Sequence, residues 1–116
     1  MMLSRDDILK AKSAYKYVDV PFNENGVIRI RVMSAAQREQ YESQMLQAKE
    51  KGVNVANFRA VMIAMTACDE KGEPIFTLED VEDISKLDWS LLDAAYIEAL
   101  KLNGMFKTSV DDAKKN

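Results

Sequence analysis

The chain has 116 residues, of which 47% are hydrophobic and 30% charged, and these values are typical of one globular domain with a single hydrophobic core. No apolar run approaches the roughly 18 to 20 residues that a transmembrane helix requires, so we expect no membrane association. The net charge of -3 and the scattered lysines and arginines argue against a nucleic-acid surface, which needs clustered basic side chains.

The N-terminal stretch MMLSRDDILKAK predicts a short capped helix rather than an export signal. Ser4 followed by Asp7 resembles a capping box, and the helix would carry Ile8 and Leu9. The stretch contains acids and lacks the apolar segment of about 7 to 15 residues that a signal peptide needs. The single cysteine, Cys68, excludes an internal disulfide and suits a reducing compartment, so we expect a cytoplasmic protein.

Residues 17–32 predict a β-hairpin with one buried face. Apolar residues alternate with other residues on both sides of a turn, at Val18, Val20 and Phe22 and again at Ile28, Ile30 and Val32. Pro21 has no backbone donor, which places the first strand at the edge of a small sheet.

The turn of this hairpin decides which residues face each other. A two-residue turn at Asn25-Gly26 would pair Val20 with Arg31 and mix an apolar residue and a charge on one face. A three-residue loop over 24–26 pairs Val20 with Ile30 instead. We therefore predict the three-residue loop, with Gly26 as a left-handed residue that closes a bulge, and with Asp19 opposite Arg31 on the solvent side.

Two helices are expected next. Ser34 with Gln37 predicts the start of a helix that runs to about Lys51 and ends at Gly52, with Tyr41, Met45 and Ala48 on one stripe. Residues 54–68 are apolar nearly all round, which predicts a helix packed on several sides. We take this segment as the central core helix.

The C-terminal half predicts a polar turn and two further capped helices. DEKGEP over 69–74 is the turn, and Thr77 with Asp80 caps a helix whose inward residues would be Leu78, Val81, Ile84 and Leu87. Asp88 caps the last helix, which stops at Asn103-Gly104. Its inward residues would be Trp89, Leu92, Tyr96, Ala99 and Leu100.

Together these elements predict a mainly helical α+β domain. Four to five helices would pack around the central apolar helix over 54–68, with one N-terminal β-hairpin over 17–32. We expect a single globular domain over 1–106 and a flexible, disordered polar tail over 107–116.

The residues that most enzymes and metal sites need are missing. The chain has no histidine, which removes imidazole bases, Ser-His and Cys-His nucleophiles and imidazole metal ligands. Cys68 ends an apolar helix without a basic neighbour, as a buried structural thiol does. The acids around Gly72 fail as a calcium loop, because Lys71 stands where a ligand is needed. We predict a protein that is not an enzyme and that holds no metal or cofactor.

Methionine is unusually frequent, at seven residues. Flexible methionine side chains suit either irregular cores or adaptable binding surfaces, and both readings stay open. In the second reading, exposed methionines beside Phe76, Phe106 or Tyr41 would form a groove for an apolar partner helix.

Several segments follow one another along nearly the whole chain as LSRDDIL, VDVP, GVIRIRVMSAAQRE, CDEKGEPIFTLEDVEDISKL, a helix ending in LNGM and a tail ending in KKN. Their order and spacing resemble the small tail assembly chaperones of long-tailed phages and prophages. Members of that family show a VP hairpin with a VRVR-like second strand, an Arg-Glu pair, a DE-G-P-F-T-ED segment and a closing Asn-Gly. The matching residues here are Val20-Pro21, Arg29 and Arg31, Arg38-Glu39, Asp69 to Asp80, and Asn103-Gly104.

The resemblance implies a non-enzymatic protein that binds the long, largely helical tape measure protein, keeps it soluble and helps to recruit tail tube subunits. It implies action in the cytoplasm of the bacterial host and absence from the finished virion. The partners expected are the tape measure protein and the tail tube protein, with self-association as a further contact. The candidate partner-binding residues are Arg29, Arg31, Met45, Met62, Met65, Phe76, Met105 and Phe106. A small cytoplasmic adaptor or antitoxin-like interaction module stays open as the alternative.

Overall fold

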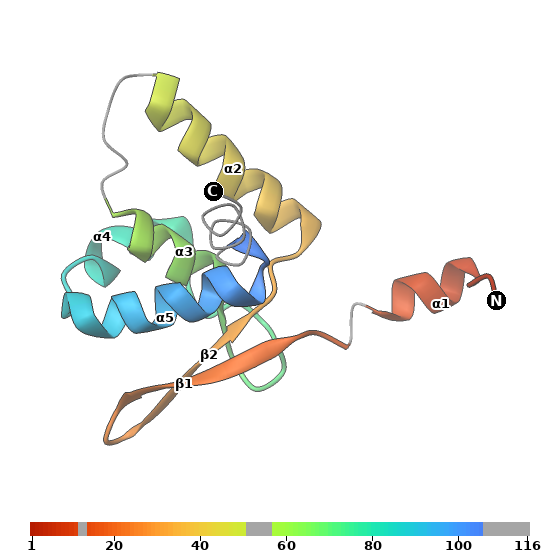
Figure 1. Ribbon diagram of the computed structural model, residues 1–116, viewed down its shortest axis with the longest axis horizontal. Helices are drawn as coiled ribbons and strands as arrows, with labels where there is room; N and C mark the ends of the chain where they lie inside the picture. The colour runs from red at the N-terminus through yellow and green to blue at the C-terminus, as the bar shows by residue number, and fades with distance from the viewer. Residues whose placement is uncertain (12–13, 51–56, 106–116) are drawn as a thin grey trace, which may run out of the picture.

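The computed structural model describes residues 1–11, 14–50 and 57–105 and confirms the predicted, mainly helical α+β class (Figure 1). The elements are α1 (Arg5–Lys10), β1 (Tyr17–Asn23), β2 (Gly26–Arg31), α2 (Ala35–Glu50), α3 (Phe58–Thr66), β3 (Ala67–Cys68), the 3-10 turn η2 (Leu78–Asp80), α4 (Val81–Ile84) and α5 (Trp89–Leu102). The predicted helix end at Gly52 and the predicted tail over 107–116 lie outside the described residues.

Helix α3 is the centre of the hydrophobic core, as its all-round apolar sequence predicts. Every residue from Ala60 to Thr66 is buried, and α2, α4, α5 and β2 pack against the helix. Its end was predicted wrongly. The helix stops at Thr66, because Ala67 takes an extended conformation and pairs with Ile30 at the edge of β2. The short strand β3 therefore takes up the last two residues of the predicted helix.

The hairpin buries its predicted face, but its register differs from the prediction by two residues. Val20 pairs with Ile28 rather than with Ile30, and Asp19 faces Arg29 rather than Arg31. The turn is the two residues between Asn23 and Gly26, and Gly26 is not in the left-handed region.

A bulge in β1 explains why the predicted loop is wrong. Pro21 pairs with Val27 and Asn23 pairs with Gly26, so Phe22 is an extra residue on its strand. This extra residue restores the alternation that a two-residue turn alone would break. The Asn23 side chain also accepts a hydrogen bond from the Asn25 N–H at 2.9 Å, which supports the tight turn.

The sheet has the order β1-β2-β3 and is antiparallel throughout. Strand β1 lies at its edge, as Pro21 predicts, and α5 packs against both hairpin strands. Ser34 and Gln37 form the predicted cap of α2 through two reciprocal hydrogen bonds. Tyr41 of α2 is buried, and α2 then rises away from the sheet (Figure 1).

The segment after the polar turn is less helical than predicted. Thr77 and Asp80 form the expected capping box, but η2 and α4 together end at Ile84. Leu87 follows that end and is 43% exposed, so its predicted inward position is wrong. Trp89 is also exposed, at 69%, so its predicted inward position is wrong as well.

The rest of α5 follows the prediction. The Asp88 side chain accepts a hydrogen bond from the Ser90 N–H at its start, and Leu92 and Ala99 are buried. Gly104 has a φ of +75° just past its end, which is the left-handed conformation that commonly terminates a helix.

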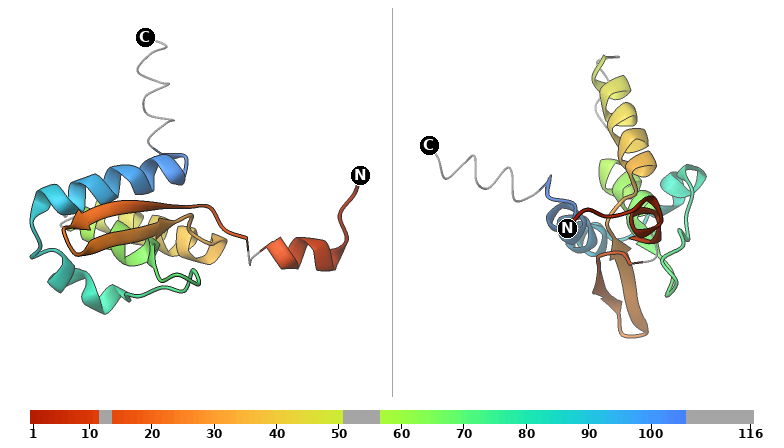
Figure 2. Two further views of the ribbon diagram at one scale, coloured as in Figure 1. Left: turned by 90° about the horizontal axis from the view of Figure 1, so that it is seen from below. Right: turned by 90° about the vertical axis from the view of Figure 1, so that its right-hand side faces the viewer.

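Helix α1 stands apart from the rest of the molecule (Figure 2). Its predicted capping box between Ser4 and Asp7 is present, yet none of its residues is buried.

Candidate docking groove

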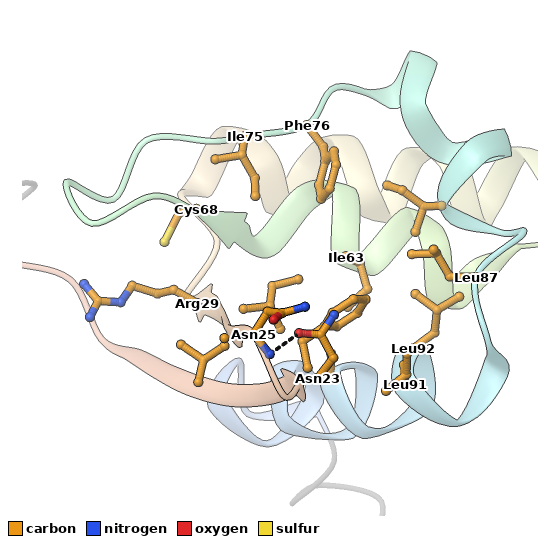
Figure 3. Close-up of a pocket in the computed structure, with 16 residues that line it drawn as sticks. Asn23, Asn25, Arg29, Ile63, Cys68, Ile75, Phe76, Leu87, Leu91 and Leu92 are labelled. Atoms are coloured by element: carbon orange, nitrogen blue, oxygen red, sulfur yellow. Dashed lines mark hydrogen bonds between the residues drawn. The ribbon is translucent and has the colours of Figure 1, made fainter.

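An apolar groove with a volume of about 350 Å³ lies between the hairpin, α3, the segment after the polar turn and α5 (Figure 3). Its lining residues are Phe22, Asn23, Asn25, Gly26, Val27, Ile28, Arg29, Ile63, Cys68, Ile75, Phe76, Ile84, Leu87, Leu91, Leu92 and Ala95. We call this feature the groove.

The shortness of β3 leaves the groove open. β3 pairs with β2 only at Arg29 and Ile30. Among the described residues, the stretch from Gly26 to Ile28 therefore has no strand on that side. The buried side chains of Ile63 and Leu92 form a floor beneath this gap.

The rim of the groove is apolar and accessible to solvent. Val27 is 59% exposed, Ile75 is 49% exposed, and Leu87 completes the rim on the α5 side. Single exposed apolar residues are ordinary, but a group of them around an apolar hollow is typical of sites that contact proteins or ligands.

A second, smaller hollow of about 180 Å³ adjoins the groove at Leu87. It shares Leu87 and Leu92 with the groove, adds the exposed Trp89, and is also lined by the polar residues Asn57, Arg59 and Ser85. Exposed apolar side chains thus continue from the groove to Trp89 at the start of α5. A helix that presents a stripe of apolar side chains suits such an elongated surface.

Among the residues that the structure describes, Arg29 is the only charged one that lines the groove, and it already has partners. Its Nε lies 2.8 Å from Asp19 Oδ1, and its guanidinium stacks 3.8 Å from the centre of the Tyr17 ring. The Arg29 hydrogen bond lowers the pKa of the Asp19 carboxyl, and Asp19 in turn raises the pKa of Arg29. Arg29 therefore marks one end of the groove without adding an uncompensated charge.

Cys68 lies at the same end and is buried as expected. Burial raises the pKa of its thiol, which disfavours the reactive thiolate. In the described part of the chain, no group of three or more acidic or cysteine side chains is placed to hold a metal ion. Within that part, no helix is both long and apolar enough to cross a bilayer.

The polar turn that precedes Ile75 and Phe76 is held by its own side chains. Asp69 accepts hydrogen bonds from the N–H groups of Lys71 at 2.8 Å and Glu73 at 3.0 Å. These bonds hold the pKa of Asp69 below its usual value, and the bond from Glu73 has the largest effect. The turn thereby sets where Ile75 and Phe76 enter the wall of the groove.

The same turn is also fastened to the base of the hairpin. Arg31 donates a hydrogen bond to the Gly72 carbonyl at 2.7 Å, and its guanidinium lies over the Tyr15 ring. The Tyr15 hydroxyl donates to the Glu70 carbonyl at 3.2 Å. Arg31 is therefore a contact between the sheet and the turn rather than a residue of the groove.

Of the seven candidate partner-binding residues that the structure describes, it brings two together. Arg29 and Phe76 line the groove. Met62 and Met65 are buried in α3, which fits the core-filling interpretation of the methionines. Met45 and Met105 are partly buried against the core. Arg31 contacts the polar turn, and Phe106 lies outside the described residues.

Sequence reasoning missed most of the apolar rim. Val27 lies on the outward face of β2 together with Arg29 and Arg31. An apolar residue among outward charged residues was the sequence feature that could have indicated the rim. Leu87 was assigned to the inner face of a helix that ends earlier than predicted. Ile75 follows the polar turn and carried no signal of its own.

Comparison with known proteins gives a likeness of fold. No family model matches the chain, and no curated protein matches its sequence. Among solved structures, the chain is similar to the bacteriophage HK97 tail assembly chaperone, with a TM-score of 0.56 and 16% sequence identity, over 82% of this chain and 96% of that chain. At this identity the likeness shows a shared fold, so the chain has the fold of a phage tail assembly chaperone.

Proposed function

We propose that the protein is a phage tail assembly chaperone that binds the tape measure protein through the groove. The observation that carries the proposal is the fold shared with the HK97 tail assembly chaperone over 82% of the chain. The exposed apolar rim of the groove supports it, because a chaperone needs a surface for apolar segments of its client. The proposed role is non-enzymatic.

The groove suits a helical client for a physical reason. A long helix with apolar side chains spaced three and four residues apart exposes a stripe that would otherwise cause aggregation. Val27, Ile75 and Leu87 would cover part of this stripe. The chaperone's net charge of -3 would help to keep the complex in solution.

Further contacts are part of the same proposal. Met45, Met105 and Phe106 would extend the apolar contact, and Arg31 would help to orient the partner. The protein would also help to recruit tail tube subunits. It would act in the host cytoplasm and would leave before the virion is complete. Mass spectrometry of purified virions tests the last step and should find no copy of this chain.

Co-expression with the tape measure protein tests the function. We expect the soluble fraction of the tape measure protein to rise when this chain is present. Leu87→Asp and Ile75→Asp should each abolish most of the rise, because they place a charge on the apolar rim. Leu46→Asp is the matched control, since Leu46 is exposed on α2 and does not line the groove.

The outcomes separate the function from the site. An unchanged soluble fraction with the wild-type chain would overturn the proposed function. A rise that survives both rim substitutions would keep the chaperone function and reject the groove as its site.

A further inference from the structure

The outer edge of β1 carries backbone groups that pair with no strand in the described part of the chain. The strand order is β1-β2-β3, so β1 has a neighbour on one side only. In an antiparallel ladder, opposite residues exchange backbone hydrogen bonds at every second pair, and the residues between them point their groups the other way. One bonded pair therefore fixes the direction of all the others.

A hydrogen bond at the base of the hairpin supplies this pair. The Val32 N–H donates to the Lys16 carbonyl at 2.9 Å, one step before the first pair of the hairpin register. Val18 and Val20 lie two and four residues further along, so their backbone groups also face β2. The residues that alternate with them point their N–H and C=O groups to the outer edge, and these are Tyr17, Asp19 and Pro21.

The other side of β2 gives the same alternation independently. The Ile75 N–H donates to the Ala67 carbonyl at 3.3 Å, so Ala67 bonds away from β2 and the next residue, Cys68, bonds toward it. Cys68 pairs with Arg29, whose backbone groups therefore face β3 rather than β1. Asp19 lies opposite Arg29 and consequently has its N–H and C=O on the outer edge.

These groups favour an extended segment as their partner. Tyr17 and Asp19 each offer an N–H and a C=O, Pro21 offers a C=O, and such groups repeat about every 7 Å along a strand. A second strand presents its groups at the same interval, whereas a helix uses its own N–H and C=O groups internally. All three residues are exposed, so an added strand can reach them.

An apolar hollow lies along the same edge. Helix α5 runs beside β1, and a hollow of about 430 Å³ lies between them (Figure 2). Its lining residues are Val18, Asp19, Val20, Pro21, Ala94, Ile97 and Glu98. The side chains on one face of an added strand would enter this hollow and pack on Val18 and Ile97. Strand addition combines main-chain bonds with pockets for alternate side chains in this way.

The charges at the hollow indicate which segment fits. Its two charged lining residues, Asp19 and Glu98, are both acidic. Basic side chains on an added strand would pair favourably with them, because cross-strand neighbours of opposite charge attract. A second copy pairing through the same edge would bring its own Asp19 and Glu98 to the contact, which is unfavourable.

We propose that the outer edge of β1 binds an extended segment of a partner protein in which apolar side chains alternate with basic ones. The apolar side chains enter the hollow, and the basic ones lie on the face of Asp19. The proposal does not rest on the groove or on the proposed function, because β1 and β3 are opposite edges of the sheet.

Nuclear magnetic resonance of the isotope-labelled full chain tests this proposal, with a capped peptide of alternating valine and lysine as the probe. We expect the amide signals of Tyr17 and Asp19 to shift. Their hydrogen exchange should slow about tenfold when the peptide is at about ten times its Kd. The amides of Val18 and Val20 already bond to β2 and should exchange as before. Such alternation between adjacent residues is specific to strand addition.

Variants of the chain test the backbone and the hollow separately. Asp19→Pro removes the N–H and should weaken peptide binding at least about tenfold, whereas Asp19→Asn keeps the N–H and should weaken it less. Ala94→Arg places a bulky positive charge in the hollow and should also weaken binding about tenfold. Gln40→Arg is its matched control, because Gln40 is exposed on α2 and does not line the hollow. Circular dichroism should show that all four variants fold.

Methylation of the peptide amides completes the test. Only one alternating set of amides faces β1, so methylation of one set should abolish binding and methylation of the other should preserve it. Absence of binding, equal effects of the two methylated peptides, or equal protection of Val18 and Asp19 would overturn the proposal. Protection of Tyr17 and Asp19 without peptide would also overturn it. The occupant would then be this chain itself, or a second copy if the protection rises with protein concentration.

Discussion

Among the three described glycines, Gly72 is the one whose backbone depends most on the absence of a side chain. Its φ is +85°, and a Cβ there would lie 2.6 Å from Cε1 of the Tyr15 ring. We expect Gly72→Ala to lower the free energy of unfolding by about 1 to 3 kcal/mol, through backbone strain and displacement of the ring. Urea denaturation at neutral pH measures the loss.

Gly26 supplies the matched control for this prediction. It has no positive φ, and a Cβ there would meet nothing within 4 Å. Gly26→Ala should therefore change the free energy of unfolding by less than about 0.5 kcal/mol. Equal losses in the two variants would mean that the contact with Tyr15 adds nothing to stability.

The Asp19–Arg29 pair predicts a pH dependence of stability. Arg29 lowers the pKa of Asp19 below its usual 3.8 in the folded state, so folding favours the ionised carboxylate. This contribution is complete above the unfolded pKa and is lost as the pH falls through the folded pKa. The stability difference between the wild type and Asp19→Asn should therefore be largest near neutral pH and should shrink below about pH 4.

Denaturation curves recorded along a pH series measure that difference. Glu24→Gln removes a charge from the turn of the same hairpin and serves as the control. A constant difference between the wild type and Asp19→Asn at all pH values would show that the Arg29 contact does not stabilise the fold.

Two of the capping boxes test how far a helix cap stabilises the whole fold. Thr77 caps the η2 and α4 segment, which packs Leu78, Val81 and Ile84 against the core. Thr77→Ala should lower the free energy of unfolding by about 1 kcal/mol. Ser4→Ala removes a similar cap from α1, which buries nothing, and should leave global unfolding unchanged. Chemical denaturation measures both, and equal losses would show that α1 packs on the domain.

At the scale of elements, the features predicted correctly depend on neighbouring residues. Ser4, Ser34, Thr77 and Asp88 all cap helices in the structure, because a cap requires only a side chain and an N–H group within three residues. The apolar faces of the hairpin are equally local, since alternation follows from the pleat.

The features that were missed depend on distant partners. The end of α3 is set by β2, which offers Ala67 and Cys68 a strand to pair with. The Phe22 bulge leaves the buried face intact, so alternation alone could not reveal it. The groove exists because β3 is two residues long, so the sequence indicated Val27 only as an apolar residue among outward charges and did not indicate Leu87 as part of the rim.

At the scale of the whole molecule, the apolar rim of the groove lies outside the core. Met62 and Met65 are buried in α3, and the core residues Ile63 and Leu92 form only the floor of the groove, while its rim consists of exposed residues. A partner can therefore change contacts at the rim without disturbing α3. Substitutions at exposed rim residues should alter binding while leaving the fold stable.

Hydrogen exchange in dilute solution should show this separation directly. Amides of α3 should exchange only through global unfolding, because every residue from Ala60 to Thr66 is buried. Amides of α5, which buries Leu92 and Ala99, should be protected similarly. Amides of α1 should exchange fastest among the helices, because a helix of six residues without tertiary contacts opens readily.

Mass spectrometry of peptides after timed labelling measures the three helices in one experiment. Protection of α1 equal to that of α3 in dilute protein would mean that α1 packs on its own domain. If protection of α1 appears only as the protein concentration rises, a second molecule must supply the contact, since the cap of α1 is the same at every concentration. The concentration dependence of protection in this one short helix therefore distinguishes an unpacked helix from one that packs on another molecule.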